Sequence, residues 1–234
     1  MDQWERKLGL IVPSWNTVME YEVQRLAGPG MSVHAQRIPH TGDTEENLLA
    51  LSTKAPAAAA LLAHAKVGVI GYGCTAGGFM KGQRDDRAMA VAIAKETGIP
   101  CVSSAAVITD ALRAVGATRI SVASAYKPWL NDRVKQDLEA AGFKVLAIQG
   151  FGTEAHSEIT PARVAALAQA VDRPGTEAIF ISCSNLRTLE SIEPVEKATG
   201  KPVVASNQSL MWGMLRVLGD RRAIPGAGRL FRDA

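Results

Sequence analysis

The segment Gly-Ile-Pro-Cys-Val-Ser-Ser at residues 98–104 has a counterpart in Gly-Lys-Pro-Val-Val-Ala-Ser at residues 200–206. Both copies follow the pattern Gly-x-Pro-x-Val-x-Ser, and each leads into a closing Leu-Arg-x-x-Gly, at residues 112–116 and 215–219. A repeat of roughly a hundred residues is too long for a solenoid and is typical of duplicated domains. The sequence therefore predicts two similar α/β domains that face each other across a cleft.

The duplication extends to the start of each half. Residues 7–26 can be laid over residues 119–138 without a gap, so that a strand, a polar turn and an amphipathic helix coincide. Strand-like apolar runs alternate with helix-like segments, which is typical of parallel sheets covered by helices on both faces. In the first half we expect strands at 8–12, 31–37, 67–72 and 101–103, and helices at 17–26, 45–66 (broken near Pro56), 87–97 and 105–115, with the same order repeated from 120 to 218.

The repeat also sets the expected domain boundaries in this α/β chain. With 234 residues, each of two domains is large enough to bury its own core. We place the first domain at residues 1–116 together with 219–234, and the second at 117–218. The tail after Leu218 is expected to pack back on the first half, and the active site is expected in the cleft.

Composition and charge narrow the class of protein. Apolar residues make up 47% and charged residues 21% of the chain, which is ordinary for a globular protein. No apolar run reaches the roughly 18 residues needed to span a bilayer, and residues 1–7 lack the apolar core of a signal peptide. We therefore expect a cytoplasmic protein with no membrane contact. The net charge of +3 comes from scattered residues, which argues against a nucleic-acid partner and is compatible with a small anionic substrate.

Two further segments share one arrangement, a cysteine at the end of an apolar strand. Residues 67–77 and 178–188 each run an apolar strand straight into a cysteine followed by small polar residues. In open α/β sheets ligands bind at the carboxyl ends of the strands, where backbone N–H groups favour an anion such as a thiolate. A lone cysteine there is more often a small buried hydrophobe, and we interpret Cys101 in that way. For Cys74 and Cys183 the symmetry of the repeat favours a facing catalytic pair.

Other kinds of site have little support. The glycines of residues 71–77 are spaced GxGxxxG rather than GxGxxG, and no Walker Lys-Ser/Thr pair follows them. Three cysteines without a CxxC pair indicate free thiols. The four histidines lack metal-ligand spacing, so we expect no metal site, and the sequence identifies no histidine as the partner of a cysteine in a Cys-His dyad; they are His34, His40, His64 and His156.

Loops at the strand ends supply candidate substrate contacts. The loops after the first strand of each half carry hydroxyl, amide and phenol groups, and those after the cysteines carry donors suited to a carboxylate oxygen. Ser14 and Asn16 have a second interpretation, because both residue types commonly cap the helix that follows them. The predicted substrate-binding residues are Ser14, Asn16, Thr75, Ala76, Tyr126, Ser184 and Asn185.

Taken together, several motifs resemble the aspartate/glutamate racemase superfamily. They are Ile-Val-Pro-Ser-Trp-Asn-Thr (11–17), Gly-Cys-Thr-Ala-Gly (73–77), Ser-Ala-Tyr (124–126), Ile-Ser-Cys-Ser-Asn-Leu-Arg (181–187) and Pro-Gly-Ala-Gly-Arg-Leu (225–230). More narrowly, the chain looks like the branch of maleate cis-trans isomerases, arylmalonate decarboxylases and racemase-like proteins of ectoine utilisation. The resemblance covers nearly the whole chain. It implies two pseudo-symmetric domains, no cofactor, cysteine chemistry beside a substrate carboxylate, and a homo-oligomer, either a dimer or a tetramer.

Departures from each subgroup refine what the resemblance implies. The decarboxylases keep only the second cysteine and have glycine in place of Cys74. Maleate isomerases keep both cysteines, an Asn and a Tyr, which correspond here to Cys74, Cys183, Asn16 and Tyr126. They also carry a second, substrate-binding Asn, and this chain has Gly152 at that position. Residues 182–188 and 200–208 look nearest to the ectoine-utilisation group.

The resemblance and the two thiols together predict a cofactor-independent isomerase or racemase. Its substrate is expected to be a small carboxylate, either an amino acid or a dicarboxylate, and the cysteines act as acid and base or as nucleophile and acid. The alternatives are a maleate cis-trans isomerase proper, an arylmalonate-type decarboxylase and a non-catalytic protein that binds a small ligand.

Overall fold

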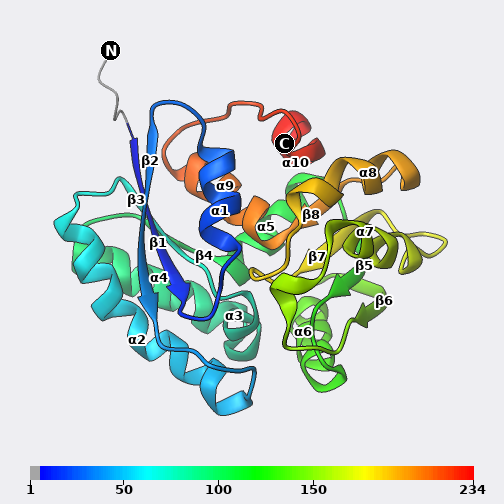
Figure 1. Ribbon diagram of the computed structural model, residues 1–234, viewed down its shortest axis with the longest axis horizontal. Coiled ribbons are helices and arrows are strands. Elements are labelled where there is room, and N and C mark those ends of the chain that lie inside the picture. Colours follow the sequence, from blue (N-terminus) through cyan, green and yellow to red (C-terminus); the bar gives the residue numbers. More distant parts are fainter. Residues whose placement is uncertain (1–5) are drawn as a thin grey trace.

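Each half of the chain forms one four-stranded parallel sheet, as the computed structural model of residues 6–234 shows (Figure 1). The first sheet has the order β2-β1-β3-β4 and the second has the order β6-β5-β7-β8. The predicted α/β class with two similar parallel sheets is therefore confirmed. The strands are β1 (Arg6–Pro13), β2 (Met31–Ile38), β3 (Val69–Tyr72), β4 (Cys101–Ser103), β5 (Arg119–Ser124), β6 (Lys144–Gly150), β7 (Ala178–Ser182) and β8 (Val203–Ala205).

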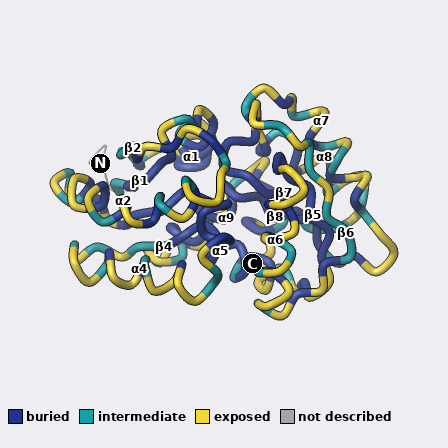
Figure 2. The backbone as a smooth tube through the Cα atoms, turned by 90° about the horizontal axis from the view of Figure 1, so that it is seen from below, coloured by how far each residue is buried: buried dark blue, intermediate teal, exposed yellow. Residues whose placement is uncertain are grey.

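Helices follow the strands and cover the sheets. Figure 2 shows the central strands buried, while outer helices such as α4 and α7 expose one side. The strands β3 and β7 are buried along their whole length, which is why their sequences are continuous apolar runs. The helices are α1 (Met19–Ala27), α2 (Glu45–His64), α3 (Thr75–Lys81), α4 (Gln83–Thr97), α5 (Ser104–Ala114), α6 (Pro128–Ala140), the short 3₁₀ turn η1 (His156–Glu158), α7 (Pro161–Ala170), α8 (Leu189–Thr199), α9 (Ser206–Val217) and α10 (Gly228–Asp233).

Three helices differ from the expectation by more than two residues at an end or in their continuity. Helix α2 runs unbroken through Pro56. The loss of one backbone hydrogen bond there is offset by the strong helix propensity of the surrounding alanines and by burial of Leu51, Ala55 and Ala59. Helix α3, which follows Cys74 directly, was not predicted because its Gly-Gly pair disfavours a helix. Helix α4 begins at Gln83 rather than at residue 87.

The C-terminal tail contacts both halves. Asp220 pairs with Arg6 at the start of β1, as expected for a tail that returns to the first half. Helix α10, in contrast, packs against α8, α9 and β8 of the second half. Its N-terminus is held there because the Arg229 N–H donates to Glu196 Oε1 at 2.9 Å and Gln208 Nε2 donates to the Ala227 carbonyl at 2.7 Å. The expected division of the chain into two domains stays a prediction.

Helices α5 and α9 join the two halves (Figure 1). They pack closely against each other, and α9 also contacts α1 and β3 of the first half. The close approach depends on Gly213, because a Cβ atom added there would lie 2.1 Å from Cγ2 of Val107. Among residues 6–234, no helix is both long and apolar enough to cross a membrane.

The Gly213→Ala variant is expected to lower the free energy of unfolding by about 2 kcal/mol, because overpacking a tight helix contact forces side chains off their rotamers. Urea unfolding measures the loss. Val107→Ala serves as the matched control, and combining it with Gly213→Ala is expected to relieve the clash, so that the two changes are strongly non-additive. Additive free energies in this double-mutant cycle would contradict the close contact.

Candidate active site

Cys74 lies between β3 and α3 and forms the N-cap of that helix. Its Sγ accepts a hydrogen bond from the Gly77 N–H at 3.3 Å. A Cβ atom at position 77 would come within 2.9 Å of Sγ, so glycine is what allows the thiol to sit there. Burial raises the pKa of the Cys74 thiol to about 12, with the Gly77 N–H acting in the opposite direction. The resting group is therefore a neutral thiol.

Cys183 follows β7 at the equivalent place in the second half. Its backbone has φ of 147°, a region that favours glycine, and its N–H donates to Ser206 Oγ at 3.1 Å. Such backbone strain persists only where the surrounding structure enforces it, and it clusters at active sites. Burial raises the pKa of this thiol as well.

The two cysteines line the same small cavity. Asp43 is the carboxylate of the lining, and no described residue of the lining is Lys or Arg. The cavity is lined by Pro13, Trp15, His40, Asp43, Leu48, Cys74, Thr75, Ala76, Tyr126, His156, Cys183, Ser184 and Asn185.

Seven of the nine predicted site residues belong to this lining, whereas Ser14 and Asn16 do not. Ser14 Oγ donates to the backbone carbonyl of His40 at 3.1 Å and accepts from its N–H at 3.0 Å. Asn16 Oδ1 accepts from the N–H groups of Val18 and Met19, both at 2.9 Å. The Asn16 carboxamide oxygen thus makes the capping contact that was its second interpretation, whereas Ser14 does not cap the helix and instead joins the loop after β1 to the loop after β2.

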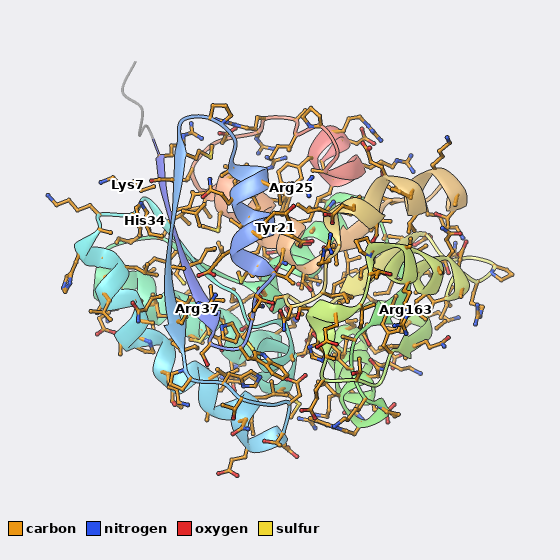
Figure 3. All side chains as sticks on the ribbon, in the orientation of Figure 1. Lys7, Tyr21, Arg25, His34, Arg37 and Arg163 are labelled. Atoms are coloured by element: carbon orange, nitrogen blue, oxygen red, sulfur yellow. The ribbon has the colours of Figure 1, made fainter. Side chains whose placement is uncertain are left out.

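Asn16 also ties the two halves together beside the cavity. Its Nδ2 donates to Ser184 Oγ at 3.1 Å, and the Thr17 N–H donates to Asn185 Oδ1 at 2.9 Å. Arg37, labelled in Figure 3, holds this loop from the other side by donating to the Asn16 carbonyl at 2.9 Å. The loop after the first strand thus positions the loop after Cys183.

A buried carboxylate supports the same loop from behind. Glu22 on α1 is fully buried and accepts from the Leu189 N–H at 2.9 Å and from Asn207 Nδ2 at 2.7 Å, as well as from the Thr188 N–H and hydroxyl. Asn207 Nδ2 in turn donates to the Ser184 carbonyl at 3.0 Å. Burial raises the pKa of Glu22, against the effect of these donors.

Two hydroxyl groups of the lining are available to a ligand. Thr75 Oγ1 and the Tyr126 hydroxyl are buried and make no close hydrogen bond within residues 6–234, although the Tyr126 hydroxyl faces Cys183. Buried polar groups are nearly always paired, so unpaired ones in a cavity indicate a binding role. Burial raises the pKa of Tyr126 well above its usual value, which keeps the phenol protonated as a donor.

The structure identifies the cysteine–histidine contact that the sequence did not. His156 Nδ1 lies 3.4 Å from Cys183 Sγ, and both side chains are buried. His40 and Asp43 complete a polar cluster that sequence reasoning did not identify. These residues follow β2 and β6, the equivalent second strands of the two halves. Because ligands bind at the carboxyl ends of parallel strands, inspection of these two loops could have found them in the sequence.

Cys101 lies outside the cavity that Cys74 and Cys183 share. Cys101 is on the edge strand β4 and lines a different surface cavity, beside Arg87 and Asp110. Over the described range 6–234, no group of three or more His, Cys, Asp or Glu side chains is arranged to hold a metal ion.

Comparison with known proteins places this geometry in a family. The sequence profile of the arylmalonate decarboxylase family matches residues 8–231, which is nearly the whole chain. The chain belongs to the arylmalonate decarboxylase family. This confirms the resemblance to the branch of arylmalonate decarboxylases and maleate isomerases, and it assigns the chain to a family of enzymes.

Relatives of the chain are named for two different activities. The maleate isomerase of Pseudomonas putida is 28% identical over 97% of this chain and 98% of its own length. The arylmalonate decarboxylase of Bordetella bronchiseptica is 33% identical over 67% of this chain and 68% of its own length. A crystal structure of a variant of the maleate isomerase from Pseudomonas putida S16, with maleate, has a TM-score of 0.94 at 26% identity and covers 98% of both chains.

A second solved structure bears on the chemistry of the family. It is a cysteine-to-serine variant of the maleate cis-trans isomerase of Nocardia farcinica with a covalently bound succinylcysteine intermediate. Its TM-score is 0.92 at 28% identity, with 98% of this chain and 99% of that chain covered. In that relative, a cysteine therefore carries a covalently bound succinyl group.

Proposed function

We propose that this chain is a cofactor-independent isomerase or racemase that acts on a small carboxylate with Cys74 and Cys183. The observation that carries the proposal is the meeting of two buried thiols, one from each half, in one small cavity. Relatives named maleate isomerase along almost the whole chain support it. The assignment of both cysteines to the reaction is our inference from their position.

The substrate carboxylate is held by neutral donors in this proposal. Thr75, Ser184 and Asn185 contribute hydroxyl and amide groups, and the Tyr126 hydroxyl is a protonated donor. Preorganised donors in a site that excludes water stabilise charge that develops on a carboxylate or enolate during the reaction. They therefore lower the barrier to forming a carbanion next to the carboxylate.

Two reactions use this arrangement. In racemisation, one cysteine as thiolate removes the proton from the α-carbon, and the other as thiol returns a proton to the opposite face. In cis-trans isomerisation, Cys74 adds to the alkene carbon, Cys183 supplies the proton, and the adduct eliminates after rotation about the single bond. The succinylcysteine of the Nocardia relative supports the second route for that relative.

Asp43 favours racemisation of an amino acid in this chain. A dicarboxylate without an ammonium group, such as maleate, would bring two uncompensated negative charges into a cavity that already holds Asp43 and whose described lining has no Lys or Arg. Like charges at close range in a buried site repel strongly. An α-ammonium group would instead be attracted to Asp43, whereas the relatives make maleate the second candidate.

Proton NMR in deuterium oxide tests the proposal with purified, reduced protein. Aspartate and glutamate as separate enantiomers, a diaminobutyrate derivative, maleate and phenylmalonate are offered one at a time. Deuterium entering the α-position with loss of chirality is the expected result, and conversion of maleate to fumarate would identify the second route. A monoacid from phenylmalonate would instead select decarboxylation.

The Cys74→Ser/Cys183→Ser double variant is the control and is expected to leave every spectrum unchanged. If the wild type also leaves every substrate unchanged but binds one of them, the chain is a binding protein and the proposal is wrong.

A further inference from the structure

Four polar side chains form a continuous row that begins at Cys183. His156 Nδ1 lies 3.4 Å from Cys183 Sγ, and His156 Nε2 lies 3.7 Å from Oδ2 of Asp43. The other oxygen of Asp43, Oδ1, lies 3.2 Å from His40 Nε2. The row joins the loop after β7 to the loops after β6 and β2 and so spans both halves of the chain.

Packing restricts the orientation of both imidazole rings. Trp15 meets the His40 ring edge-on at a centroid distance of 4.9 Å and the His156 ring at 5.3 Å. Both histidines are buried, with 4% and 2% of their surfaces exposed. A ring that is fixed between a thiol and a carboxylate can exchange a proton with one while the other stabilises the charge.

Cys74 lacks this arrangement. Its Sγ accepts from the Gly77 N–H, and no hydrogen bond among residues 6–234 joins it to a histidine. The two thiols of the cavity are therefore chemically different, although the repeat places them symmetrically.

We propose that His156 is the proton acceptor of the Cys183 thiol, with Asp43 and His40 as the residues that position it. The S–H bond of Cys183 breaks, its electron pair stays on Sγ, and the proton forms an N–H bond at Nδ1 of His156. This step uses the neutral tautomer that carries its proton on Nε2, which faces Asp43. The products are a thiolate and an imidazolium, so charge and atoms balance without a redox partner.

Burial disfavours charge on both groups, so the transfer depends on their direct contact. Burial lowers the pKa of His156, which keeps the resting ring neutral, and the charge of His40 reinforces this lowering. Asp43, the Thr153 backbone and Glu154 raise the pKa of His156 and so stabilise the imidazolium once it forms. Burial raises the pKa of Cys183, so a nearby acceptor is needed to form its thiolate.

Other titratable groups also face this pair. Asp43 and Cys74 raise the pKa of Cys183 further, while the Asn185 N–H and the Tyr126 hydroxyl lower it. The Tyr126 ring lies 6.1 Å from that of His156.

The role in turnover rests on the proposed function, but proton transfer itself can be measured without a substrate. In racemisation, Cys183 would be the thiolate that removes the α-proton, and Cys74 would be the thiol that donates to the opposite face. His156 contacts the reacting sulfur and is thus a catalytic residue, whereas Asp43 acts through it.

Alkylation by iodoacetamide reports the thiolate directly, since the thiolate is the nucleophile. In the Cys74→Ser/Cys101→Ser background Cys183 is the sole cysteine, and its alkylation rate is measured by mass spectrometry across neutral and alkaline pH. Adding His156→Gln, which keeps a polar side chain but cannot take the proton, is expected to slow alkylation at neutral pH about tenfold and to move the pH midpoint up by about one unit. An unchanged rate and midpoint in the folded variant would overturn the proposal.

The matched control keeps Cys74 as the sole cysteine, in a Cys101→Ser/Cys183→Ser background. There His156→Gln is expected to leave the pH midpoint of alkylation unchanged, and an equal shift at both cysteines would mean that the substitution only alters access to the cavity. His156→Asn provides a second variant if His156→Gln does not fold. It also cannot take the proton, so it is expected to raise the midpoint of Cys183 in the same way, and an unchanged midpoint in it overturns the proposal in that case.

The outcomes separate this inference from the proposed function. A shifted alkylation midpoint with no turnover of any substrate supports the role of His156 and contradicts the isomerase proposal. Turnover of a substrate with an unshifted alkylation midpoint supports the isomerase proposal and contradicts the role of His156.

Discussion

The Cys74→Ser and Cys183→Ser variants are each expected to lose about 10³-fold or more in kcat on the substrate found by NMR, because a serine hydroxyl is a far weaker acid and nucleophile than a thiol. Both cavity thiols are needed if each serves one face of the reacting carbon. Serine is nearly the same size as cysteine, so circular dichroism and the free energy of unfolding should change little.

Cys101→Ser is the matched control, since Cys101 lies outside the cavity on the edge strand β4. Its kcat is expected to stay at the wild-type value. Full activity in either cavity variant would contradict the two-thiol mechanism. If maleate is the substrate, Cys183→Ser is expected to accumulate a covalent adduct on Cys74, which intact-protein mass spectrometry would detect.

The Glu22→Ala variant is expected to lower the free energy of unfolding by about 4 kcal/mol, because it leaves several buried donors unpaired and opens a cavity. The donors are those that join α1 to the start of α8, at Thr188, Leu189 and Asn207. Since Asn207 also holds the Ser184 carbonyl, the variant is expected to lose activity even where it is folded. Urea unfolding and kcat measured on the same preparation check both effects.

Glu22→Gln is the control, because it keeps the shape and one acceptor oxygen. Burial raises the pKa of Glu22 above its ordinary value of 4.5, so the folded protein binds this proton more tightly than the unfolded chain. The free energy of unfolding of the wild type is therefore expected to fall as the pH rises from 4.5 toward the raised pKa, relative to that of Glu22→Gln. A difference between the two proteins that does not depend on pH would contradict the burial of an ionisable group at this place.

The α/β class followed from local patterns that tertiary structure did not override. Continuous apolar runs such as residues 178–182 predict buried parallel strands, because such strands are covered on both faces. In the structure this segment is the fully buried strand β7. The segments that escaped prediction are those where propensity and packing conflict. Helix α2 crosses Pro56 because burial of its apolar face outweighs one lost hydrogen bond, and α3 forms despite its glycines because Cys74 caps it.

Much of the cavity lining was also predictable, for a topological reason. The carboxyl ends of parallel strands meet at one edge, so Cys74, Cys183 and Tyr126 had to lie near the inter-sheet region if the repeat was real. Ser14 and Asn16 follow a strand end too, yet Ser14 bonds the backbone of His40, and Asn16 caps the start of α1 and donates to Ser184. Whether a polar side chain turns toward its own helix or toward a cavity depends on packing that sequence spacing does not report.

Sequence alone specified the duplicated architecture, the two cysteine-bearing strand ends and the absence of metal-ligand spacing, because each of these depends on residues that are near one another along the chain. The contact between Cys183 and His156, and the row through Asp43 to His40, depend on segments that are far apart in sequence. Only the packing of the two halves brings these loops together, with His156 Nε2 3.7 Å from Asp43, and that packing makes two cysteines that are equivalent in the repeat chemically unequal.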